Sequence, residues 1–215
     1  MVTEMTRREF VSTAAAAAIP SISPVPLIVP VHRVWDSRAQ CTAQQLRQFS
    51  SSLWPEAVRD FERCGIQLQI TQVTGEVRRS PGGRPLFIGL EHGKVNFLIT
   101  DHILQNWDRG KGLTGVSTRY DGYHLSMVAL AYAHGHQIPF VSVNTCVHEL
   151  LHVLLQDIFE IHPTGLPGYE RELRIDWYAT RLWLFHEGAA IRKAAVAYLD
   201  RLRSTVTARC PEFRS

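Results

Sequence analysis

The hydrophobic positions of the chain follow two different periods, and each period predicts one kind of element. Between residues 42 and 64 the apolar side chains recur at helical spacing, with Thr42 as the N-cap and Gly65 just beyond the end. Pro55 lies inside this segment and predicts a kink or a division into two helices. Short alternating or continuous apolar segments predict strands at residues 31–35, 66–73, 86–88, 95–99 and 123–132.

The last third of the chain has the period of helices. Helices are predicted at residues 143–159, 169–186 and 189–203, and the glycine-containing segments 78–85 and 107–118 are expected to form loops. A strand, a long helix, several strands and then helices predict an α+β fold. We expect one domain over residues 31–215, with the sheet and the first of these helices in 31–160 and a helical part in 161–215.

Composition narrows the class of protein without identifying it. The 215 residues are 45% hydrophobic and 20% charged, as in a soluble globular domain. A formal net charge of +3 is too small to indicate a nucleic-acid partner. The cysteines contain no CxxC pair, so they permit either disulfides of unknown connectivity or reduced thiols at Cys41, Cys64, Cys146 and Cys210.

Residues 1–30 are predicted to be an export signal and linker rather than part of the fold. Arg7 and Arg8 precede Phe10, and no charged side chain occurs from Phe10 to Val31. This order is that of an export signal, and the paired arginines resemble a twin-arginine signal. Four prolines disfavour the alternative of a membrane anchor, and a disordered cytosolic tail is the other alternative. The resemblance implies an exported protein (periplasmic, cell-envelope or secreted) with no stable membrane insertion after processing.

Residues 148–152 read His-Glu-Leu-Leu-His, which is the HExxH motif. On a helix, His148 and His152 lie one turn apart on the same face, so both can bind one tetrahedral ion. Glu149 is offset towards a water beside that ion, where its carboxylate can act as a general base. The surrounding residues are strongly apolar, so both imidazoles are expected to be buried. The motif predicts a zinc site, and the alternative is a pair of hydrogen-bonded core histidines.

A catalytic zinc ion takes three protein ligands and leaves one position open. We expect Glu172, on the predicted helix 169–186, to be the third ligand. Asp176 lies four residues later on the same helix face and is either an alternative ligand or the group that orients a ligand histidine. His162 and Glu160 are further alternatives.

An HExxH motif followed on the next helix by Glu-x-x-x-Asp resembles the gluzincin group of the zincin metallopeptidases, most closely the prenyl-protease type. The resemblance covers residues 143–183. It implies a small mixed sheet with a backing helix and an active-site helix, followed by a short helical subdomain. It also implies that His148, His152 and Glu172 are the zinc ligands. Glu149 is then the general base, and Asp176 is a carboxylate that lies behind the ligands.

The function expected from these residues is that of a hydrolase, a zinc metalloprotease that cleaves peptide bonds in proteins, short peptides or cell-wall peptides. Glu149 takes a proton from the attacking water and returns it to the leaving amine. The resemblance implies that a strand near the active-site helix binds the substrate as an added strand, for which segments 95–99 and 123–130 are the candidates, and the alternative is that both are ordinary strands of the sheet. The alternative is an exported zinc-binding module whose site is structural, with Cys146, His162 or Asp176 closing the fourth position. Both hypotheses leave the oligomeric state open.

Overall fold

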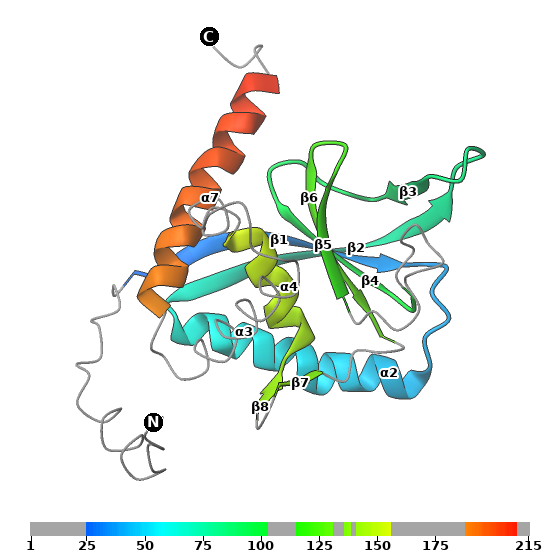
Figure 1. Ribbon diagram of the computed structural model, residues 1–215, viewed down its shortest axis with the longest axis horizontal. Coiled ribbons are helices and arrows are strands. Elements are labelled where there is room, and N and C mark those ends of the chain that lie inside the picture. Colours follow the sequence, from blue (N-terminus) through cyan, green and yellow to red (C-terminus); the bar gives the residue numbers. More distant parts are fainter. Residues whose placement is uncertain (1–24, 103–114, 131–135, 139–140, 156–187, 210–215) are drawn as a thin grey trace, which may run out of the picture.

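The computed structural model describes residues 25–102, 115–130, 136–138, 141–155 and 188–209, which form an α+β fold (Figure 1). Six strands make one mixed sheet in the order β3-β2-β1-β4-β6-β5. Its four inner strands are parallel, namely β1 (Leu27–Asp36), β2 (Ile66–Arg79), β4 (Val95–Thr100) and β6 (Tyr123–Ala129). The edge strands β3 (Pro85–Ile88) and β5 (Gly115–Tyr120) run antiparallel to their neighbours. Separately, β7 (His136–Ile138) pairs with β8 (Val141–Val143).

The predicted strands are all present, and three of the strand boundaries are wrong. The first strand begins at Leu27 and pairs with β2 from there, so residues 27–30, which were expected to be a linker outside the fold, belong to the sheet. The strand that begins at Ile66 continues to Arg79, because its last four residues pair with β3. Strand β5 begins inside the predicted loop 107–118, because Asp121 and Gly122, with φ of 46° and 80°, fold it back against β6. Such a two-residue turn with both φ positive matches the twist of the two strands it joins.

The predicted helix between residues 42 and 64 is divided as Pro55 indicates. It consists of α2 (Ala43–Gln48), a π-helical turn (Phe49–Leu53) and α3 (Trp54–Arg63). Thr42 caps α2 through a capping box, in which its Oγ1 accepts from Gln45 and its N–H donates to the Gln45 side chain. Pro55 lies in the first turn of α3, directly after the π-helical turn, so the residue without an N–H stands where the helical hydrogen-bond pattern changes.

Two further helices are described, α4 (Thr145–Leu154) and α7 (Gly188–Arg209). The helix predicted to start at residue 143 starts two residues later, because Val143 ends β8. Arg192 of α7 donates to the carbonyl groups of Gly65 and Val25, so it ties α7 to the region where β1 and β2 begin. The predicted helix 169–186 lies outside the described residues.

The sheet has an apolar core on each face. Val31 and Phe97 belong to the larger core, which also contains apolar side chains of α3, α4 and α7. Alternate residues of the same strands, such as Val34 and Leu98, belong to a smaller core on the other face. The hydroxyl of Tyr120 in β5 donates to the carbonyl of Pro85 in β3 at 2.9 Å, so the two edges of the curled sheet meet at one end.

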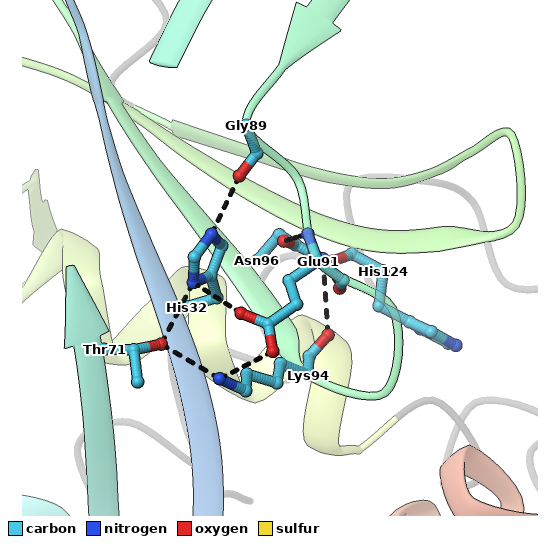
Figure 2. Close-up of polar contacts among 7 residues, drawn as sticks. All are labelled: His32, Thr71, Gly89, Glu91, Lys94, Asn96 and His124. Carbon is cyan, nitrogen blue, oxygen red and sulfur yellow. Dashed lines mark hydrogen bonds and ion pairs between the residues drawn. The ribbon is translucent and has the colours of Figure 1, made fainter. Parts of the chain in front are cut away.

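A buried histidine joins three segments on the face of the smaller core (Figure 2). His32 in β1 is 5% exposed, and its Nε2 donates to the carbonyl of Gly89 at 2.8 Å. Its Nδ1 lies 3.0 Å from the Thr71 hydroxyl in β2 and 3.1 Å from the Glu91 carboxylate. Asn96 in β4 accepts from the Glu91 N–H at 2.7 Å. These contacts hold the connection between β3 and β4 against the sheet.

The described cysteines form no disulfide, and most of the predicted export signal lies outside the described residues. Cys41, Cys64 and Cys146 are free thiols, and Cys210 lies outside the described residues. Residues 1–24, which carry most of the predicted export signal, are also outside them. Within the described part of the chain, no helix is long and apolar enough to cross a membrane.

Candidate metal centre

Helix α4 is positioned by the residue that precedes it. The Asn144 side chain accepts from the N–H groups of Cys146 and Val147 at 2.9 and 3.3 Å, which caps the helix. Its amide also donates to the carbonyl of Leu53 at 2.7 Å, so the start of α4 is tied to the π-helical turn. Every residue of α4 is buried except half-buried His152. The HExxH motif is therefore carried by a helix that protein surrounds on nearly all sides.

The two histidines of the motif converge. The Nε2 atoms of His148 and His152 face each other at 2.9 Å, and the two rings are inclined at 70°. Two nitrogens bound to one tetrahedral zinc ion at ~2.0–2.1 Å lie ~3.3 Å apart, so the pair needs to open by only a few tenths of an ångström. The helical spacing of the motif thus brings two nitrogens to one point, as the sequence predicts.

Glu149 completes the group. One oxygen of its carboxylate and one nitrogen of each histidine all lie within 4.8 Å of one another. Among the residues that the structure describes, no other group of three His, Cys, Asp or Glu side chains has this geometry. The two imidazoles suit zinc and other divalent transition metals, and the Glu149 carboxylate lies beside them.

The strands β5 and β6 present small residues to α4, which lets the helix approach closely. The Ser117 hydroxyl lies 2.8 Å from Oε2 of Glu149, and the Ser126 hydroxyl donates to the Glu149 carbonyl at 3.0 Å. A Cβ at Gly115 would lie 2.7 Å from Cδ of Glu149 and closer still to Oε1. Only glycine therefore leaves room for the carboxylate, which is 3% exposed.

The sequence analysis missed Gly115 and Ser117, because both lie in the segment expected to be a loop. One signal could have found them. Asp121-Gly122 followed by the apolar strand 123–129 is typical of a hairpin, which places Ser117 opposite Ser126 in the partner strand. No sequence signal indicates that this hairpin would lie against the HExxH helix.

Cys146, a possible fourth ligand, does not join the group. Burial raises the pKa of its thiol far above the ordinary value, and the charge of Glu149 acts in the same direction. The structural observation is that the Cys146 sulfur is not among the ligand atoms that converge at His148, Glu149 and His152. The two other residues considered for the fourth position, His162 and Asp176, lie outside the described residues.

The preferred third ligand, Glu172, lies outside the described residues, and so does Glu160. Other histidines have different surroundings. His92 stacks on Tyr123 with ring centroids 3.9 Å apart, and Nδ1 of His102 lies 3.4 Å from the Asp101 carboxylate. Neither histidine belongs to a group of three possible ligands in the described part of the chain.

The strands expected to bind a substrate strand cannot do so. Strand β4 is paired with β1 and β6, and β6 is paired with β4 and β5, so the edges of both are occupied. This expectation was wrong because sequence alone does not give the order of strands in a sheet. The edge strand beside α4 is β5.

No protein-family model matches the chain, and no curated protein matches it.

Proposed function

We propose that the protein is a zinc-dependent peptidase with a zincin-like fold. The observation that carries this proposal is the placement of Glu149. Its carboxylate is buried beside two histidine nitrogens that converge on one point, on the same helix. A structural zinc site needs the histidines but has no use for this carboxylate.

The chemistry of the residues supports a bound cation. Burying a carboxylate costs free energy unless donors or a positive charge compensate it. Glu149 has the Ser117 hydroxyl nearby, and an ion on the adjacent imidazoles would add two positive charges. The two facing nitrogens also repel each other unless a proton or a metal ion lies between them. Zinc held by His148 and His152 satisfies both requirements.

Each residue then has a part in hydrolysis. A zinc ion, when bound, lowers the pKa of water and polarises a carbonyl group. Glu149 takes the proton of the attacking water and later delivers it to the leaving amine. Burial keeps the Glu149 carboxylate apart from bulk water, where competing proton transfers would occur. The proposal retains Glu172 as the third ligand and Asp176 as a carboxylate that orients a ligand histidine.

The substrate we propose is a peptide in extended conformation. Strand β5 is the sheet edge next to Glu149, and an edge strand offers unpaired backbone groups to an added strand. The first residue of β5, Gly115, lies against the carboxylate. A peptide paired with this end of β5 would place its backbone carbonyls near Glu149. We retain export through the twin-arginine signal as part of the proposal.

The test combines metal analysis with a peptidase assay on casein. Protein purified without chelator should contain about one zinc per chain, and the Glu149→Gln variant should keep it. Removal of a general base should lower kcat by about 10²–10⁴-fold. Glutamine preserves the shape of glutamate, so loss of activity with metal retained isolates the proton transfer.

Chelation distinguishes the binding-module alternative. If removal of zinc abolishes casein cleavage while the far-UV circular dichroism spectrum is unchanged, the ion is catalytic. Unfolding upon chelation, with no cleavage by the zinc-loaded protein, would instead show a structural ion. A zinc-free wild type that also binds no added zinc would contradict the proposal as a whole.

A further inference from the structure

The Ser117 hydroxyl occupies a central place behind Glu149. Its Oγ lies 2.8 Å from Oε2 of the Glu149 carboxylate, 2.8 Å from the Glu149 carbonyl and 2.9 Å from the Ser126 hydroxyl. One side chain of the edge strand thus contacts both the backbone and the reacting group of the same glutamate. The position is half-buried, whereas Ser126 and Glu149 are buried.

The number of hydroxyl hydrogens determines which serine donates to the Glu149 carbonyl and which to its carboxylate. Each serine carries one hydroxyl hydrogen, and the Ser126 hydroxyl has the Glu149 carbonyl as an acceptor at 3.0 Å. Because the carbonyl accepts a hydrogen bond from Ser126, the Ser117 hydrogen is available for the carboxylate. A hydrogen bond to a charged oxygen is stronger than one to a neutral carbonyl, which favours this arrangement.

Gly115 and Ser117 act on the carboxylate from the same face of β5. They are two residues apart in a strand, so their side chains point to the same side. The backbone at Gly115 lies against Cδ and Oε1, while the Ser117 hydroxyl reaches Oε2. One carboxylate oxygen is limited by packing and the other is held by a donor.

We propose that Ser117 is a positioning residue for the general base, a role that rests on the proposed peptidase function. Its hydroxyl fixes the orientation of the Glu149 carboxylate by donating to Oε2. The same hydroxyl can rotate and accept a hydrogen bond when the carboxyl group holds a proton during turnover. It therefore keeps the Glu149 carboxylate in one place through both proton transfers. A misplaced catalytic group lowers the reaction rate, so this positioning affects kcat.

The experiment compares Ser117→Thr with Ser117→Val in the zinc-loaded protein. The two substitutions have nearly the same shape, both suit a strand, and they differ in the hydroxyl. Casein peptides of defined sequence are used to obtain kcat and KM. We expect the threonine variant to stay within about threefold of the wild type. The valine variant should lose about 10- to 100-fold in kcat with KM and zinc content unchanged, as for a lost hydrogen bond to a charged group.

Ser126→Ala is the matched control. It removes a hydroxyl from the same pair and breaks a bond to the same glutamate, but only to its backbone carbonyl. We expect it to lower Tm and to leave kcat within about threefold. The Ser117 hydrogen should stay on the carboxylate in this variant, because a charged acceptor is favoured over the carbonyl that the Ser126 hydroxyl leaves. A loss of kcat equal to that of Ser117→Val would overturn the positioning role, because the Ser117 hydroxyl would then be present without holding the carboxylate.

A second measurement does not depend on activity. The difference in Tm between the threonine and valine variants should shrink in a Glu149→Gln background, because the donor then meets a neutral amide instead of a carboxylate. An equal difference in both backgrounds would show that Ser117 does not act on the carboxylate. If the wild type cleaves peptides and both Ser117 variants match it, this inference fails alone. If the zinc-loaded wild type cleaves none, the proposed function fails with it.

Discussion

His32 and the pair of His148 and His152 lie on opposite faces of the same sheet, and they are built differently. His32 faces three partners, one in β2 and two in the connection between β3 and β4, and the carbonyl of Gly89 fixes a hydrogen on its Nε2 (Figure 2). His148 and His152 come from one helix, and their Nε2 atoms face each other at 2.9 Å. The first arrangement joins one imidazole to groups from distant segments, whereas the second brings the same nitrogen of two imidazoles together.

The difference separates a structural histidine from a candidate ligand. A buried polar group in a stable fold has complementary partners, and His32 follows that rule across β1, β2 and the connection before β4. Two imidazole nitrogens that converge on one point can bind one ion when neither carries a hydrogen, which is the geometry of a metal site. His32 and His148 are equally buried, at 5% exposure, and His152 is half-buried, so the direction of the nitrogens is what distinguishes the pair from His32.

Metal binding gives the largest expected contrast. His152→Ala should weaken zinc binding by more than about 100-fold, because it removes one of the proposed ligands and even outer groups contribute 10- to 100-fold. His32→Ala should bind zinc as tightly as the wild type. Competition with a chromogenic chelator measures both affinities. Equal losses of zinc affinity in the two variants would contradict the assignment of His152 as a ligand and His32 as a structural residue.

Substitutions at Gly115 and Gly75 should separate an effect on the candidate site from an effect on the stability of the sheet. A methyl group at Gly115 would displace the Glu149 carboxylate, and a displacement of about 1 Å can lower kcat about 100-fold. A methyl group at Gly75 would instead overlap the Ile88 carbonyl and the Val34 side chain. We therefore expect Gly115→Ala to lose kcat with zinc retained, and Gly75→Ala to lower Tm at unchanged kcat. Steady-state kinetics and thermal unfolding measure the two effects, and unchanged kcat in Gly115→Ala would contradict the packing argument.

The network around His32 should affect stability rather than activity. His32→Ala leaves the Gly89 carbonyl without its buried donor, and we expect the free energy of unfolding to fall by about 1–3 kcal/mol. Glu91→Gln changes a side chain that is 44% exposed, and its effect should stay below about 1 kcal/mol. Urea unfolding measures both changes. A smaller loss for His32→Ala than for Glu91→Gln would show that the buried contacts do not hold this connection.

The smallest expected effect is a pH dependence that involves neither group. Burial, with smaller contributions from Arg119 and Arg201, lowers the pKa of His124 to about 4. The unfolded chain takes up this proton near pH 6.5 and the folded chain only near pH 4, so protonation favours unfolding between these values. The stabilising effect of neutral His124 is complete above pH 6.5 and is lost as the pH falls to about 4. Urea unfolding at pH 7 and pH 5 should show a smaller loss in His124→Gln than in the wild type. Identical losses would contradict the expected shift.

Local patterns predicted much of the fold. The capping box at Thr42, the division near Pro55 and the alternating strands depend on neighbours within a few residues, and the structure contains all three. The start of β5 at Gly115 was missed because the residues before it are rich in glycine and polar side chains. The order of the strands in the sheet could not be predicted from the sequence, so β5 could not be identified as the edge strand beside α4.

The sequence by itself determined the convergence of His148 and His152, because a helix places residues four apart on one face. It also determined that Glu149 would lie beside them. The tertiary structure decided what surrounds that carboxylate. Gly115 and Ser117 reach it from a strand more than 30 residues earlier in the chain, and the hydrogen bond between Ser117 and Glu149 exists only because β5 pairs with β6 under α4. Helical spacing is a local property of the backbone, whereas contacts across a sheet depend on how distant segments pack.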